Sequence, residues 1–167
     1  TTAASEAQLL AFSMALGPTG QQLGFTATEV LSLGASMIAM GMDASNAGTR
    51  LNRAFSMIGQ NLEELAKFMD VPVEEFVQSV EERPMDTLLN VVDKLSQVEG
   101  KLKANTVAAG IFGEIGAKGI KSIAQDVDGV RTNLVNSAKA YEDNTSLSEE
   151  FAAKTDTLNA KFTIFGN

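Results

Sequence analysis

The sequence contains no cysteine, no histidine and no tryptophan among its 167 residues. Without cysteine the chain cannot form a disulfide or offer a thiol nucleophile. Without histidine it lacks the commonest acid–base group and the commonest zinc ligand. These absences exclude serine–histidine and cysteine–histidine catalysis and the standard zinc sites. The lack of cysteine is compatible with a reducing compartment.

Positive charge is also scarce. Thirteen lysines and arginines stand against 21 aspartates and glutamates, which gives a formal net charge of −8. The basic residues are scattered, and no run of them forms an electrostatic footprint for phosphates. The composition therefore argues against nucleic-acid binding as the main role.

Long apolar runs are missing as well. No segment approaches the ~20 apolar residues that a membrane-spanning helix needs, and no secretory signal pattern is present. The nearest approach, residues 30–42, is interrupted by Ser32, Gly34, Ser36 and Gly41. We predict that this stretch is a buried helix.

What the sequence does contain is a repeated helix junction. Gly24-Phe25-Thr26 and Gly41-Met42-Asp43 follow the same pattern 17 residues apart. Each has a glycine that can end a helix in the left-handed conformation, an apolar residue, and a side-chain oxygen that can cap the next helix. Thr26 and Glu29 also fit a capping box. A weaker third copy at 70–76 places Pro72 near the first helical turn.

Helical periodicity runs through almost the whole chain, whereas no convincing β-hairpin is found. Apolar spacing and breakers predict helices at about 6–16, 27–40, 44–59, 61–69, 73–82, 88–98, 101–112, 117–125, 127–141 and 147–165. Residues 18–24 are predicted to be a loop and residues 142–146 a polar linker. The predicted fold is all-α: a compact multi-helix bundle of about eight to ten short helices joined by tight Gly/Pro turns.

Two details of this prediction can be checked side chain by side chain. Asn61, with Glu64 three residues later, is expected to cap the helix that follows it. The stretch 127–141 is expected to bury one face, made of Val127, Val130, Leu134, Ala138 and Tyr141.

For domain organisation we expect an N-terminal helix and Gly/Pro loop at residues 1–23 and a helical core region at 24–167, within one domain. The chain begins at a threonine and ends in an apolar stretch, Phe162 to Asn167. We therefore expect it to be a piece of a longer protein.

Glycines recur at every third position at 110, 113, 116 and 119. A phosphate-binding loop would need Gly-Lys followed directly by Ser or Thr, which is not the order here, and a nucleic-acid clamp would need strands and basic flanks. We interpret these glycines as a helix end and a close helix crossing.

Acidic residues offer two further candidates. Asp126 to Gly129 resembles the start of a calcium loop, but Ser137 stands where the closing glutamate belongs, so we interpret it as a helix-start turn. Paired glutamates at 63–64, 74–75, 81–82 and 149–150 mostly fall in first helical turns or on polar faces. We expect no catalytic residues, no cofactor and no metal site. Methionines at 37, 40, 42, 57, 69 and 85 are expected to fill the core, with an exposed contact face as the alternative.

The chain resembles the conserved core of tail tape measure proteins of tailed bacteriophages, also called phage minor tail proteins, including prophage copies. The resemblance rests on ordered phrases spanning about residues 24–165: EVLSLGASM (29–37), MGMDASNAGTRLNR (40–53), PMDTLL (84–89), IFG (111–113) and EFAAKTDTL (150–158). The family often has leucine where this chain has Met40, and a small polar residue in place of Pro72.

The resemblance implies a structural role in the virion tail. Such a protein lies in the tail tube lumen, acts as a ruler for tail length and leaves ahead of the DNA at ejection, after a cytoplasmic stage during assembly. It implies other copies of the chain and tail tube or tail chaperone proteins as partners, and a possible membrane contact at ejection, but no small-molecule substrate and no catalytic residues. The residues alone leave open a generic helical interaction module, a cell-wall lytic fragment and a membrane-active segment.

Overall fold

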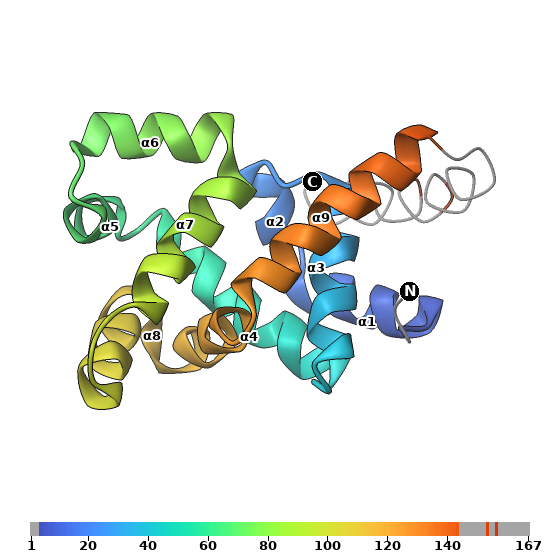
Figure 1. Cartoon of the computed structure of the whole chain (residues 1–167), viewed down its shortest axis with the longest axis horizontal. Helices are drawn as coiled ribbons and strands as arrows, with labels where there is room; N and C mark the ends of the chain where they lie inside the picture. The colour runs from blue at the N-terminus through green and yellow to red at the C-terminus, as the bar shows by residue number, and fades with distance from the viewer. Residues whose placement is uncertain (1–3, 144–152, 154–155, 157–167) are drawn as a thin grey trace. The chain divides into compact units, whose positions relative to one another are not determined.

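The computed structural model describes residues 4–143 together with Ala153 and Asp156. Within residues 4–143 the secondary structure is nine helices and no strand (Figure 1), which confirms the all-α prediction. The helices are α1 Glu6–Leu16, α2 Thr19–Leu23, α3 Ala27–Ala39, α4 Ala44–Ile58, α5 Leu62–Met69, α6 Val73–Glu82, α7 Pro84–Ser96, α8 Lys101–Ala124 and α9 Val127–Asp143.

The chain divides into two units. Unit 1 comprises Thr1–Thr49 and Asp128–Asn167, and unit 2 comprises Arg50–Val127. The first boundary falls inside α4. Unit 1 is thus assembled from two distant stretches of sequence, whereas unit 2 is one continuous stretch. The predicted division at residues 23 and 24 stays a prediction.

The predicted helix junctions are confirmed in detail. Gly24 and Gly41 have φ values of 93° and 88°, which is the left-handed region that glycine adopts without strain. At the start of α3 the Glu29 amide donates to Thr26 Oγ1 at 3.1 Å, and the Thr26 amide donates to Glu29 Oε1 at 2.8 Å. At the start of α4 the Asn46 amide donates to Asp43 Oδ2 at 3.0 Å. These helix ends satisfy their first amides locally.

The loop predicted for residues 18–24 is wrong, because most of it forms the short helix α2. Pro18 has φ −76°, which suits a helix start, and its carbonyl accepts from the Gln22 amide at 3.0 Å. Gly20 is buried where an added Cβ would lie 3.4–3.5 Å from Val30, Leu16 and Phe25. Packing of this small residue offsets the low helix propensity of glycine.

The helices predicted at 101–112 and 117–125 form one element, α8, with a kink at Gly113. Gly113 has φ 75° and ψ 166°, so the predicted helix end is confirmed, but helix resumes directly after it. The kink interrupts the ladder of helical hydrogen bonds near the carbonyl of Ile111.

The capping role predicted for Asn61 is wrong. Asn61 precedes α5, but its side chain makes no capping hydrogen bond there. Its Nδ2 instead donates to the carbonyl oxygen of Ile111, at 2.7 Å across 50 residues of sequence. The kink leaves the Ile111 carbonyl without a helical donor, and the Asn61 side chain donates to it instead of capping α5.

Each unit has its own apolar core. In unit 1 the buried side chains include Leu9, Phe12, Leu16, Val30, Leu33 and Met37. In unit 2 they include Leu51, Ala54, Phe55, Leu65, Leu88, Val92, Phe112, Ile120 and Ile123. In unit 2, α7 packs against both α6 and α8, and in unit 1 α1 packs against α3.

The face predicted for residues 127–141 is only partly buried. Val127 and Val130 are buried, but Leu134 is half-buried and Ala138 is exposed. Later turns of α9 use polar contacts instead, described below. Residues 142 and 143 belong to α9, so the predicted start of the polar linker is wrong. The predicted helix at 147–165, the linker residues 144–146 and the Tyr141 side chain lie outside the described part, apart from Ala153 and Asp156, which are helical and exposed.

Candidate interaction surface

The residues singled out for chemistry are not gathered into a reactive centre in the described part of the chain. Over residues 4–143, Ala153 and Asp156, no three side chains of the metal-binding types lie close enough to hold an ion. Asp126 precedes the first residue of α9, as the helix-start interpretation requires. Glu63 and Glu64 lie in the first turn of α5, and Glu74 and Glu75 in that of α6.

Among the helices that the structure describes, none has the length and apolar character needed to cross a membrane.

The methionines are mostly interior. Met37 and Met85 are buried, and the other four that the sequence singled out are half-buried. The one methionine among the exposed large apolar side chains is Met14, which is 49% exposed. The core-filling interpretation is confirmed for Met37 and Met85.

Glycines permit close helix crossings in both units. In unit 1, an added Cβ at Gly34 would lie 2.7 Å from Phe12 Cδ1, and one at Gly48 would lie 2.8 Å from Ala15 Cβ. In unit 2, α8 crosses α4 after the kink. A Cβ at Gly116 would lie 2.8 Å from the backbone of Ala54, and one at Gly119 would lie 3.0 Å from Leu51. The interpretation of the glycine series as a helix end and a crossing is confirmed at 113, 116 and 119.

A short polar ladder joins α3 and α9 within unit 1. Asn133 Nδ2 donates to Ser36 Oγ at 2.7 Å, and the Ser137 and Ser32 hydroxyl oxygens lie 3.3 Å apart. Both pairs are spaced by four residues, so they lie one turn apart on each helix. Ser32 and Ser36 are buried, and this explains why the apolar stretch 30–42 contains serines.

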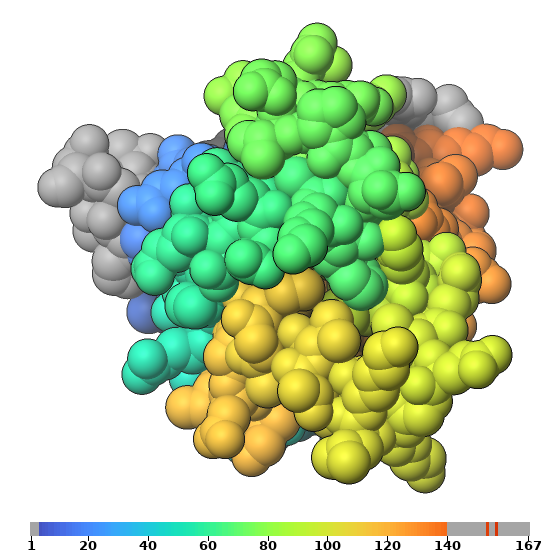
Figure 2. Space-filling view, turned by 90° about the vertical axis from the view of Figure 1, so that its left-hand side faces the viewer, coloured from blue at the N-terminus to red at the C-terminus, as the bar shows by residue number. Residues whose placement is uncertain are grey.

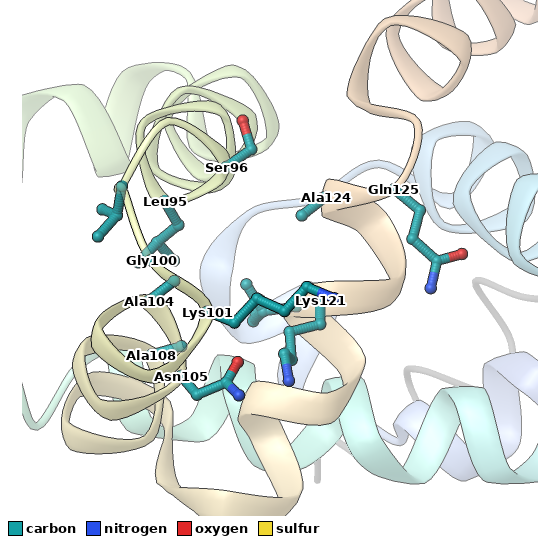
Figure 3. A pocket seen from close by; sticks show the side chains of 12 residues that line it. Leu95, Ser96, Gly100, Lys101, Ala104, Asn105, Ala108, Lys121, Ala124 and Gln125 are labelled. Carbon is teal, nitrogen blue, oxygen red and sulfur yellow. The ribbon is translucent and has the colours of Figure 1, made fainter.

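Unit 2 contains an open groove of about 420 Å³ between the end of α7 and the two halves of α8 (Figure 3). Its polar lining is Ser96, Lys101, Asn105, Lys121 and Gln125; its apolar lining includes Leu95, Val98, Ala104, Ala108, Ile120 and Ala124. Among the described residues that line it, none carries a carboxylate. Figure 3 shows Lys101, Asn105 and Lys121 converging on the space between the two halves of α8. This arrangement suits an amphipathic, negatively charged ligand surface.

The sequence did not predict this groove. It exists because Gly113 folds the two halves of α8 back toward each other, which brings Lys101 and Lys121 together from 20 positions apart. A glycine inside a helical pattern, at Gly113, was the sequence signal for a kink. The neighbouring residues do not determine the direction that the chain takes after the kink, so the groove could not be predicted.

A sequence profile of the family described as phage-related minor tail protein matches residues 1–113. The chain belongs to this family. The match covers more than half of the chain, and it includes the phrases at 29–37, 40–53 and 84–89 on which the resemblance rested. The last of those phrases, at 150–158, lies beyond the matched residues. No curated protein and no solved structure matches the chain significantly.

Membership of the phage-related minor tail protein family makes this chain a component of a phage tail. The fold is in keeping with a structural part. In the described part, α1, α3 and α4 begin with local side-chain caps. The buried hydroxyls of Ser13, Thr87 and Ser122 donate to backbone carbonyls, and those of Ser32 and Ser36 contact side chains of α9.

Proposed function

We propose that this chain is part of a tail tape measure, which sets tail length during assembly and is released when DNA is ejected. The observation that carries the proposal is the family match over residues 1–113, on a chain whose described part is all helical. The ordered phrases that resemble those of tape measure proteins support this more specific role. On this proposal the protein lies in the tail tube lumen, after a stage in the bacterial cytoplasm.

Locally capped helices suit a protein that has to change its packing. The caps at Ser5, Thr26 and Asp43 reach only three residues along the chain. They remain in place when a helix leaves its neighbours, so the first amides of α1, α3 and α4 stay partly satisfied. These three helices could therefore be extended in a narrow tube without losing their caps, whereas α2 and α5 to α8 have no side-chain cap.

The ruler role predicts a length effect. Fully helical and extended, 167 residues would span ~250 Å at 1.5 Å per residue. An in-frame deletion of this segment from the phage gene should shorten tails by up to about that length, and deletion of half should shorten them by half as much. Electron microscopy of purified tails measures the change.

A matched control replaces the segment with an unrelated helical sequence of the same length, which should restore the original tail length. Tails of unchanged length after the deletion would contradict the ruler role, although the family assignment would stand. We also propose that the chain is not an enzyme and that its partners are further copies of itself and tail tube or tail chaperone proteins.

A further inference from the structure

We propose that unit 2 carries a self-association surface in which the acidic helix α6 of one copy docks into the lysine groove of a second copy. The inference names a surface for the contact between copies that the proposed function includes, and to that extent it rests on that function. Sedimentation tests the surface, whereas tail length tests the ruler role. It rests on the opposite charges of two elements of the same unit and on the lining of the groove.

The helix α6 presents a continuous acidic face. Its ten residues include four glutamates and no basic residue. Glu74, Glu75, Gln78, Glu81 and Glu82 are all exposed, at the i, i+1, i+4, i+7 and i+8 spacing of one helical face. The carboxylate of Glu82 accepts a hydrogen bond from Gln78 at 2.9 Å, so the partner of that glutamate lies on the same face.

The helix α8 has the opposite charge. It carries four lysines and a single glutamate, which is unusual in a chain with a net charge of −8. Two of these lysines, Lys101 and Lys121, line the groove, and Figure 3 shows their side chains extending into it.

Within one copy these two surfaces lie at opposite ends of unit 2. Figures 1 and 2 both show α6 at one end of the unit and α8 at the other. An acidic face and a basic groove on separate parts of one molecule are complementary between copies, because each copy offers one of each. The contact is heterologous, so copies would associate head to tail.

Charge alone would hold such a contact weakly, because exposed ion pairs contribute little. The groove adds an apolar lining that includes the half-buried Val98, Ala104 and Ala124. The helix α6 offers the half-buried Val77 and Val80 beside its glutamates. The carboxylates therefore set orientation and rate of encounter, and the apolar contacts add affinity.

Reciprocal charge reversal tests the proposal by sedimentation of the whole chain over a range of concentrations. The groove variant is Lys101→Glu with Lys121→Glu, and the α6 variant is Glu81→Lys with Glu82→Lys. Lys101→Glu places a negative charge at the N-terminus of α8, and Glu81→Lys with Glu82→Lys places positive charges at the C-terminus of α6. Both changes suit the helix dipole, so we expect them to leave the fold intact. We expect each variant alone to associate at least about tenfold more weakly than the original chain. A mixture of the two should regain association, because opposite charges meet again.

The matched control is Lys103→Glu with Lys118→Glu, which makes the same charge change on exposed lysines of α8 outside the groove. It should keep the association, and circular dichroism should show all variants equally helical. A chain that is monomeric at every concentration would overturn the proposal, as would association unaffected by the groove variant or a mixture that stays monomeric. The proposal would also be overturned if the chain stayed monomeric and bound duplex DNA through Lys101 and Lys121. The groove would then be a phosphate-binding site.

Discussion

At the scale of single residues, the closest helix contacts depend on glycines that have no Cβ atom. At Gly116 the nearest atoms to an added methyl group belong to the backbone of Ala54, which cannot turn aside as a side chain can. Gly110, only six residues earlier in the same helix, has nothing within 4 Å of the same position. A side chain would therefore clash at Gly116 but would fit freely at Gly110.

Replacing each of these glycines by alanine should therefore give opposite signs. Gly116→Ala should lower the free energy of unfolding by about 1–3 kcal/mol, because a methyl group is forced against fixed backbone. Gly110→Ala should raise it by about 0.4–1 kcal/mol, because alanine restricts the unfolded chain and favours helix. Urea unfolding followed by circular dichroism measures both. Equal shifts in the two variants would show that α8 does not cross α4 closely.

At the scale of elements, a kink in one helix determines how another begins. The interruption at Gly113 leaves the carbonyl of Ile111 in need of a donor, and the side chain of Asn61 supplies it. Asn61 therefore acts as a donor to α8 and not as an acceptor at the start of α5. This contact ties together two helices separated by 50 residues.

Two substitutions at Asn61 separate these roles. Asn61→Ala should destabilise the chain by about 1–3 kcal/mol, because a partly buried carbonyl loses its donor. Asn61→Asp should be at least as damaging, since a carboxylate cannot donate to the carbonyl of Ile111. Were Asn61 an N-terminal cap, aspartate would serve equally well and stability would be unchanged. Thermal unfolding of the two variants distinguishes the outcomes.

At the scale of the whole molecule, the two units differ in whether one stretch of sequence or two stretches form them. Unit 2 is continuous and has its own core and crossings. Unit 1 needs the pairing of α3 with α9, as in the hydrogen bond of Asn133 to Ser36 across 97 residues. A unit with its own core can in principle fold alone.

We therefore expect a fragment of residues 44–127, which keeps α4 whole, to fold by itself. It should show a helical circular dichroism spectrum and a cooperative thermal transition. Gly116→Ala should lower the stability of this fragment by about the same 1–3 kcal/mol as in the whole chain. An unfolded fragment would show that unit 2 depends on contacts outside residues 44–127.

Local patterns predicted what is governed by local chemistry. The capping box at Thr26, the left-handed glycines at 24 and 41 and the buried helix predicted at 30–42 depend on residues within a few positions of each other, so the sequence was sufficient for them. The same reasoning failed at residues 18–24 and at Asn61. At Asn61 a contact from a distant part of the chain outweighs the local preference. At residues 18–24 the short helix packs Gly20 among Leu16, Phe25 and Val30, which the pattern of turn residues does not reveal.

The sequence by itself therefore determined the class of fold, the starts of α3 and α4 and the absence of histidine and cysteine chemistry. The sequence also carries the family match that places the chain among phage tail proteins. Only the tertiary structure decided that Lys101 and Lys121 share a groove, that Asn61 serves α8 and that the serines of α3 meet α9. The physical reason is that caps and periodicity act over one or two helical turns. The direction taken after a glycine kink is instead set by which side chains pack best at long range.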